Sequence, residues 1–149
     1  MLLYCLLRNI KYLNVFLVGF LFLNNNKNEI METQQIAERL AELCNKGNFE
    51  QAQKELFAED AVSIEPHAAA GFEKETKGLN AILEKGKKFQ SLIEETHSCR
   101  ASAPIVVGDV IALGLFMDVT MKGQKRTPMN ELIVYKVKDG KIISEQFFV

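Results

Sequence analysis

The sequence is poor in the residues that build metal sites and disulfide frameworks. Its 149 residues include only three cysteines and two histidines. An odd number of cysteines without a CxxC spacing argues against both a disulfide framework and a zinc site. His67 and His97 lie far apart in the chain and have no paired ligands beside them, so they form no recognisable metal constellation. We therefore expect no metal, no other cofactor and a reduced, cytoplasmic setting.

The sequence also lacks an excess of charge of either sign. The formal net charge is -1, which gives no electrostatic basis for binding nucleic acid or an anionic membrane. The run "KGKK" at 85–88 falls within a helical segment, and we interpret it as the solvated face of that helix. No phosphate-binding loop and no hydrolase nucleophile elbow is present. We expect no nucleic-acid partner, and a membrane partner only if the N-terminal segment provides one.

Residues 1–30 form a hydrophobic extension with a dense apolar run at 15–23. The run is shorter than the roughly 20 residues of a membrane-spanning helix. It has the size of a secretory signal core, but "NNNKNE" follows it instead of a small-residue cleavage site. Three interpretations stay open: a reading frame begun upstream of a true start at Met31, an exported or membrane-anchored protein, or ordinary structure. We expect this segment not to pack into the domain core.

Residues 31–149 have the pattern of one globular domain. Apolar residues recur at helical spacing in three segments, and the pattern then changes to the period-two alternation of strands. Asp139-Gly140 between two alternating runs is a strong hairpin signal. The sequence therefore predicts an α+β domain whose long sheet, closed on one face by helices, can enclose a cavity for a small ligand. The predicted helices span 33–46, 49–57 and 79–92, and the predicted strands span 61–65, 93–107, 110–121, 127–137 and 142–149.

Two stretches of the domain resemble a known superfamily. "NKGNFEQAQKELFAEDAVSIEP" and "IVYKVKDGKIISEQFF" are similar to the SnoaL-like branch of the nuclear-transport-factor-two-like superfamily, which includes ketosteroid isomerase and polyketide cyclases. The resemblance covers about residues 32–149. It implies a cone-shaped, strongly curved antiparallel sheet wrapped around three N-terminal helices, with a small hydrophobic ligand inside the cone. It also implies a homodimer formed through the outer sheet face, which would carry Val110, Ala112, Phe116, Leu132, Val134 and Phe148.

Comparison with ketosteroid isomerase suggests a candidate base. The "DATVED" motif of that enzyme ends in its proton-abstracting carboxylate, and aligning it with "DAVSIE" places Glu65 at this position. The two donors of the oxyanion hole correspond to Leu40 and to Ile133 or Leu132. None of these side chains can donate a hydrogen bond. The resemblance thus keeps the base but argues against steroid isomerisation by that route.

Strand alternation extends the candidate site, because side chains two residues apart share a face. One face of the strand at 127–137 carries Glu131 as the single charge in an apolar row, and the resemblance directs this face toward the pocket. On the last strand, Ile143, Glu145, Phe147 and Val149 are expected to point the same way. The predicted catalytic residues are Glu65, Glu131, Tyr135 and His67. The predicted pocket residues are Leu40, Leu113, Leu115, Met117, Ile133, Glu145 and Phe147.

Two functions of different classes follow. The first is a cofactor-free isomerase, cyclase or dehydratase that acts by proton transfer on a small, largely apolar carbonyl compound. Glu65 would be the base, Glu131 or Tyr135 the donor, and His67 a gate or proton source. The alternative is a non-catalytic ligand-binding or dimerisation domain, which the missing oxyanion donors favour.

Overall fold

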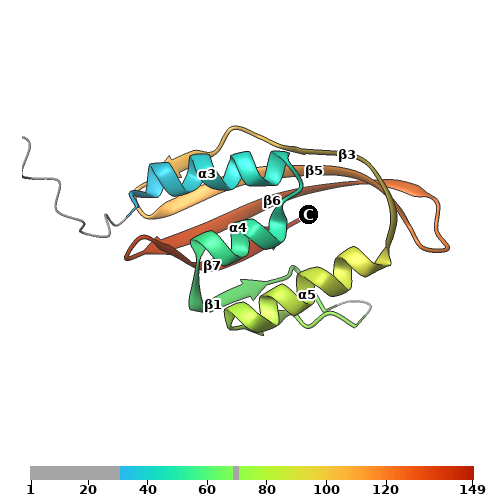
Figure 1. Cartoon of the computed structure of the whole chain (residues 1–149), viewed down its shortest axis with the longest axis horizontal. Coiled ribbons are helices and arrows are strands. Elements are labelled where there is room, and N and C mark those ends of the chain that lie inside the picture. Colours follow the sequence, from blue (N-terminus) through green and yellow to red (C-terminus); the bar gives the residue numbers. More distant parts are fainter. Residues whose placement is uncertain (1–30, 69–70) are drawn as a thin grey trace, which may run out of the picture.

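The computed structural model describes residues 31–68 and 71–149 (Figure 1). The predicted extension at 1–30, with its three interpretations, lies outside the described residues. Across the part that is described, no helix is both long enough and apolar enough to cross a membrane. The helices are α3 (Thr33–Asn45), α4 (Phe49–Leu56) and α5 (Leu79–Leu92). The strands are β1 (Phe57–Ile64), β2 (Glu75–Lys77), β3 (Ile93–Ala101), β4 (Ile105–Val107), β5 (Val110–Met121), β6 (Arg126–Lys138) and β7 (Lys141–Phe148).

A single curved sheet carries the three helices on one of its faces (Figure 1). Its strand order is β2-β1-β7-β6-β5-β3, and β4 pairs with β5. The predicted α+β fold, with a curved sheet wrapped around three helices, is confirmed. The sheet is mixed rather than purely antiparallel, because β1 runs parallel to β7. This pairing joins the first and the last strand of the domain and places the end of β1 beside β7.

Some strand boundaries differ from the predicted ones. Strand β1 begins at Phe57, four residues earlier than predicted, and the short strand β2 was not predicted. The predicted strand at 93–107 is divided into β3 and β4 by residues 102–104. Pro104 lies in this break, and a proline has no N–H to donate to a strand ladder. These changes affect β1–β4, whereas β5, β6 and β7 lie within one residue of their predicted bounds.

Two turns are specified by residues that tolerate positive φ. Gly47, with φ of 69°, ends α3 and lets the chain reverse into α4. Asp139 and Gly140 both have positive φ, at 50° and 74°, as the hairpin turn between β6 and β7 requires. The predicted hairpin is therefore confirmed, and it sets the first β6–β7 pairs, Lys138 with Lys141 and Val137 with Ile142.

The inner face of the sheet follows the predicted alternation on β5 and β6. Leu113 and Val119 are fully buried, and Ile133, Tyr135 and Val137 are nearly so. On β7 the register shifts, because Val137 pairs with Ile142 while the preceding Lys136 pairs with Ser144. Ile143 is the extra residue of this bulge, and Ile142 takes the buried position. The inward placement predicted for Ile143 is wrong. Val149 lies beyond the end of β7 and is 81% exposed.

A carboxylate and lysine cluster on the inner face

The polar residues of the inner face gather where β1, β7 and β6 lie side by side. Ser63 on β1 is in register with Glu145 on β7, and Glu145 is paired with Tyr135 on β6. The Ser63 hydroxyl donates a 2.6 Å hydrogen bond to Oε1 of Glu145. Both residues are buried, so this bond offsets part of the cost of removing the carboxyl group from water. One transverse row of the sheet therefore carries a hydroxyl, a carboxyl and a phenol.

Lys85 brings a positive charge to this row from helix α5. Its Nζ donates a hydrogen bond to Ser63 Oγ and a second, of 2.7 Å, to Oε1 of Glu65. The same Nζ lies 5.2 Å from the centre of the Phe147 ring. Only 13% of the Lys85 side chain is exposed. The interpretation of 85–88 as a solvated face is therefore wrong for Lys85, although Lys87 and Lys88 are exposed as expected.

Glu65 lies just beyond the end of β1, where the chain leaves the sheet. Its backbone N–H donates to the carbonyl oxygen of Lys74, and the following Pro66 has no N–H to continue the ladder. Its side chain is 24% exposed and forms the ion pair with Lys85. Glu65 therefore faces the cluster and still has access to solvent. We denote Ser63, Glu65, Lys85, Glu131, Tyr135 and Glu145 the inner polar cluster.

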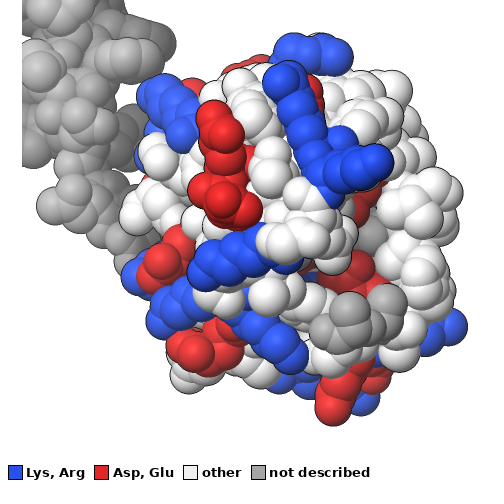
Figure 2. All heavy atoms as spheres, turned by 90° about the vertical axis from the view of Figure 1, so that its right-hand side faces the viewer, with Lys and Arg blue, Asp and Glu red and all other residues white. Residues whose placement is uncertain are grey.

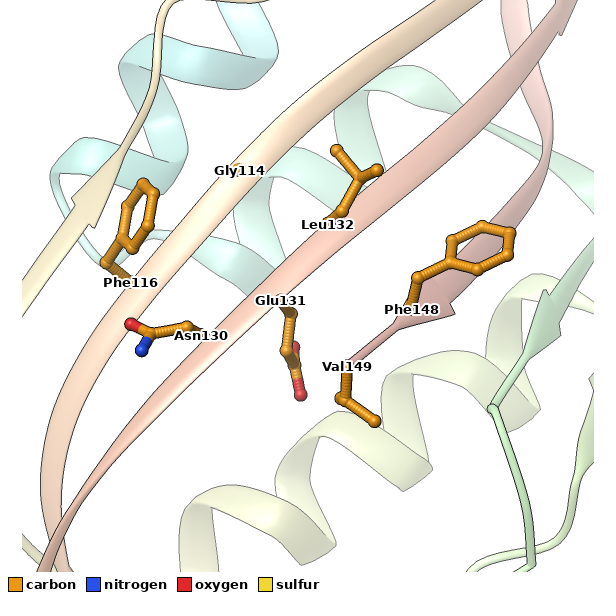
Figure 3. A pocket seen from close by; sticks show the side chains of 7 residues that line it. All are labelled: Gly114, Phe116, Asn130, Glu131, Leu132, Phe148 and Val149. Atoms are coloured by element: carbon orange, nitrogen blue, oxygen red, sulfur yellow. The ribbon is translucent and has the colours of Figure 1, made fainter.

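Glu131 occupies the part of β6 that β7 does not reach. The β6–β7 pair farthest from the hairpin is Leu132 with Phe148, so the adjacent Glu131 has no pairing partner on β7. Figure 3 shows the Glu131 side chain extending past the end of β7 toward α5. Burial raises the pKa of Glu131, the charge of Glu65 raises it further, and Lys85 opposes both effects. Both members of the ion pair therefore affect the pKa of Glu131, and this residue holds its proton more tightly than an ordinary glutamate does.

Burial dominates the protonation of the two innermost acids. It raises the pKa of Glu145, while the hydrogen bond from Ser63 and the charge of Lys85 lower it. The pKa of Tyr135 is raised well above its ordinary value, first by burial and then by the charge of Glu145. The Tyr135 ring also packs edge-on against Phe57, with the ring centres 6.4 Å apart. Burial therefore makes both side chains harder to ionise than they are in water.

The remaining predicted site residues divide into core and surface. Leu40 and Ile133 are each 2% exposed, and Leu113 is fully buried. Leu115 and Met117 are also buried, and Phe147 is half-buried beside Lys85. His67 is exposed in the turn after Pro66, and its role as a gate or proton source stays a prediction.

The outer face of the sheet carries a shallow hollow of about 410 Å³ (Figure 3). Of the four predicted catalytic residues, Glu131 alone lines it, which connects the hollow with the edge of the inner polar cluster. Leu132 and Phe148 are 48% and 44% exposed there. The hollow is lined by Gly114, Phe116, Asn130, Glu131, Leu132, Phe148 and Val149.

Acidic and basic side chains are interspersed on the face of the molecule seen in Figure 2. Exposed ion pairs also occur on the molecule, such as Arg126 with Asp118 and Lys46 with Glu42. That face therefore presents no continuous patch of one sign.

Sequence reasoning missed two members of the inner polar cluster, Lys85 and Ser63. Lys85 lies three residues after the buried Ile82 and four before Phe89, which packs against the core. This spacing places the lysine on the buried stripe of α5. Ser63 lies two residues from both Ala61 and Glu65, so strand alternation directs it inward with them. Both signals are present in the sequence.

The fold and the family can now be assigned. A curved, open sheet holding three helices on one face is the arrangement of structures described as nuclear-transport-factor-two-like or ketosteroid isomerase-like. The family model of the SnoaL-like domain matches residues 31–149 of the chain. The chain belongs to the SnoaL-like domain family. No match was found among curated proteins.

Solved structures support this assignment. A protein from Mesorhizobium loti, whose name proposes a SnoaL-like polyketide cyclase, is 33% identical with a TM-score of 0.73, covering 80% of this chain and 100% of its own. IdmH from Streptomyces antibioticus, whose name proposes a polyketide cyclase, is 21% identical with a TM-score of 0.61, covering 79% and 91%. A ketosteroid isomerase-like protein from Catenulispora acidiphila, in complex with trimethylamine, is 19% identical with a TM-score of 0.59, covering 77% and 85%. At 21% and 19% identity, IdmH and the Catenulispora acidiphila protein show a similarity of fold alone.

The raised pKa of Glu145 predicts a pH-dependent contribution to stability. A carboxyl group that binds its proton more tightly when folded stabilises the fold fully below its unfolded pKa, near 4.5. That contribution is lost as the pH rises through the folded pKa. Relative to Glu145→Gln, which cannot titrate, the wild-type free energy of unfolding should fall as pH increases from about 4.5. Urea unfolding of both proteins at several pH values measures the difference, and parallel curves would contradict the prediction.

Proposed function

We propose that this protein is a cofactor-free enzyme that moves a proton on a small, largely apolar carbonyl compound, as an isomerase, cyclase or dehydratase. The observation that supports this most is the placement of an ion-paired carboxylate, Glu65, beside two buried carboxyl groups, Glu131 and Glu145, whose pKa is raised by burial. A base and an acid set apart by their surroundings are what proton transfer at neutral pH needs. The likeness to proteins whose names propose polyketide cyclases agrees with this reaction class.

In the proposed reaction, Glu65 accepts a proton from the carbon next to the carbonyl group. The electron pair of the broken C–H bond forms a carbon–carbon double bond, and the carbonyl π electrons move to the oxygen to give an enolate. Glu131, which holds its proton more tightly than usual, returns a proton to the enolate at the same or a different carbon. The proton on Glu65 then passes to Glu131, directly or through solvent that takes one proton from Glu65 and returns one to Glu131, so the enzyme is regenerated without an oxidant or reductant.

Exchange of carbon-bound hydrogen for deuterium tests this proposal without knowledge of the natural substrate. The protein is incubated in deuterium oxide with a panel of small enolisable ketones and 1,3-diketones, and NMR follows the loss of the α-proton signal. We expect exchange above the buffer rate for at least one neutral, largely apolar member of the panel. Buffer-rate exchange throughout, at protein concentrations where ligands bind, would contradict an enzymatic role.

The alternative is a ligand-binding domain without turnover. It is favoured by the apolar residues at the positions where ketosteroid isomerase has its oxyanion donors. Leu40 and Ile133 are both buried there. A binding domain would show saturable chemical-shift changes with members of the same panel, but no exchange. The single experiment therefore separates the two functions.

We also propose that two copies of the chain pair through the outer sheet face. Leu132 and Phe148 expose apolar surface there beside the hollow, and apolar patches of this kind usually mark an interface. Light scattering at micromolar concentration should give the mass of a dimer, and Leu132→Glu should shift it to a monomer. Leu92→Glu, an exposed leucine at the end of α5, is the matched control and should leave the mass unchanged. A monomeric wild type would refute this pairing.

A further inference from the structure

We propose that Lys85 binds the carbonyl oxygen of the ligand and stabilises the negative charge that develops on it. This assigns to α5 a function that neither Leu40 nor Ile133 can perform, because their side chains have no hydrogen-bond donor. The inference rests on the proposed function for its catalytic part. Its binding part, the contact between an ammonium group and a ligand oxygen, holds for the binding-domain alternative as well.

The hydrogen bonds of Lys85 leave one donor for a ligand. An ammonium group has three N–H donors and no acceptor. Two of them are directed to Ser63 and Glu65, and Nζ lies 5.2 Å from the centre of the Phe147 ring. An aromatic face attracts a cation more weakly than a charged or carbonyl oxygen does at hydrogen-bond distance. A ligand oxygen above Phe147 can therefore replace this contact with a stronger one.

The position of the ammonium group is fixed before any ligand arrives. Ser63, which accepts from Lys85, is fully buried, and it donates in turn to the buried Glu145. Glu65 holds the ammonium group from the other side at 2.7 Å. A donor held in this way does not have to reorganise when charge develops on the ligand, which is the condition for effective electrostatic stabilisation.

The local charges indicate the class of ligand. Lys85 and Glu65 neutralise each other, and burial favours the uncharged forms of Glu131 and Glu145. Burial in the inner polar cluster therefore disfavours additional charge, and a neutral enolisable ketone, enol or phenol suits it better than a charged ligand. The Lys85 and Glu65 side chains are 13% and 24% exposed, so the ion pair is partly open to solvent.

In the reaction proposed above, Lys85 donates its third N–H to the oxygen as Glu65 removes the carbon-bound proton. The oxygen gains the negative charge of the enolate, and the ammonium group keeps its proton throughout. When the carbon is protonated again, the carbonyl group re-forms and the charge on the oxygen is lost. Lys85 therefore acts as an electrostatic catalyst and undergoes no net change.

Two substitutions test the catalytic part in the deuterium exchange assay. Lys85→Met removes the charge and the donors while keeping most of the side-chain volume, and should lower the maximal exchange rate about 10²–10³-fold. Lys85→Arg keeps the charge and should recover part of the rate. Lys87→Met, on the same helix but exposed, is the matched control and should leave the rate unchanged. Far-UV circular dichroism and thermal melting establish that each variant is folded.

A phenol separates direct contact with the ligand from an indirect effect through Glu65. The absorption band of 4-nitrophenolate reports whether the bound probe is ionised. The wild type should favour the bound phenolate, and Lys85→Met should lose this preference. Glu65→Gln, which leaves the ammonium group in place, should keep or strengthen it. If Lys85 only positioned Glu65, both substitutions would weaken phenolate binding equally.

The outcomes distinguish failure of the inference from failure of the proposed function. Exchange in the wild type that is unchanged in Lys85→Met overturns the inference alone. Phenolate stabilisation that depends on Lys85, in a protein without exchange, supports the inference and overturns the enzymatic proposal. Absence of both exchange and phenolate stabilisation in the wild type overturns both.

Discussion

Replacing Glu65 by glutamine should reduce deuterium exchange into an enolisable ketone by about 10²–10⁴-fold, the usual contribution of a general base. Glutamine has nearly the same shape, and its carbonyl oxygen can still accept the hydrogen bond from Lys85. It cannot take a proton from carbon at neutral pH. We therefore expect the melting temperature and the affinity for a bound phenol to change little while exchange is lost. NMR exchange rates and thermal melts measure the two effects separately.

Glu94→Gln is the matched control for this substitution. Glu94 is exposed on β3, which β5 separates from the three strands of the cluster, and the same chemical change there should leave exchange unaffected. If Glu65→Gln retains full exchange while Glu131→Gln loses it, the base is Glu131 and the two roles are reversed. Exchange that survives both substitutions would contradict catalysis by Glu65 or Glu131.

The central part of the site could be predicted because strand alternation is a strict rule. On β6, the inward direction of Glu131, Ile133 and Tyr135 follows from their spacing of two residues, and no bulge interrupts the ladder with β5 at these positions. The Asp139-Gly140 hairpin sets β7 opposite β6, and the bulge at Ile143 then brings Glu145 rather than Ser144 opposite Tyr135. A regular ladder therefore carries a local sequence pattern directly into three dimensions.

Prediction failed where pairing is irregular or crosses the chain. The bulge at Ile143 reverses the inward direction on one part of β7, and only the pairing partner reveals it. The parallel pairing of β1 with β7 joins strands separated by most of the domain, and no local pattern specifies it. That pairing is what brings Ser63 next to Glu145.

Lys85 was missed because composition was given more weight than helical phase. Three lysines in "KGKK" suggest a solvated surface, and for two of them this is correct. The third lies on the same stripe as Leu79, Ile82 and Phe89, which the helical spacing already identified as buried. A charged residue on a buried stripe must find a partner of opposite charge, and here Glu65 provides it. A charge that breaks an apolar stripe is therefore the signal that could have found this residue.

Truncating Leu113 to alanine should reduce the free energy of unfolding by about 2–5 kcal/mol. Leu113 lies in the middle of β5, is fully buried, and is paired with Ile133 on β6. A side chain with no exposed surface is in contact with protein atoms on all sides, so its removal leaves a void as well as losing apolar burial. Urea unfolding of the wild type and the variant measures this difference.

The same measurement tests whether Leu113 borders a ligand cavity, as predicted from the sequence. A side chain that borders an open pocket makes fewer contacts, so its truncation leaves less new void and costs less. Leu92→Ala provides the comparison, because the same substitution at a residue that is 36% exposed should cost about 1 kcal/mol or less. A cost for Leu113→Ala as small as that for Leu92→Ala would place Leu113 at a pocket. A cost in the range expected for a packed core would limit the ligand site to the neighbourhood of Lys85, Glu65 and Glu131.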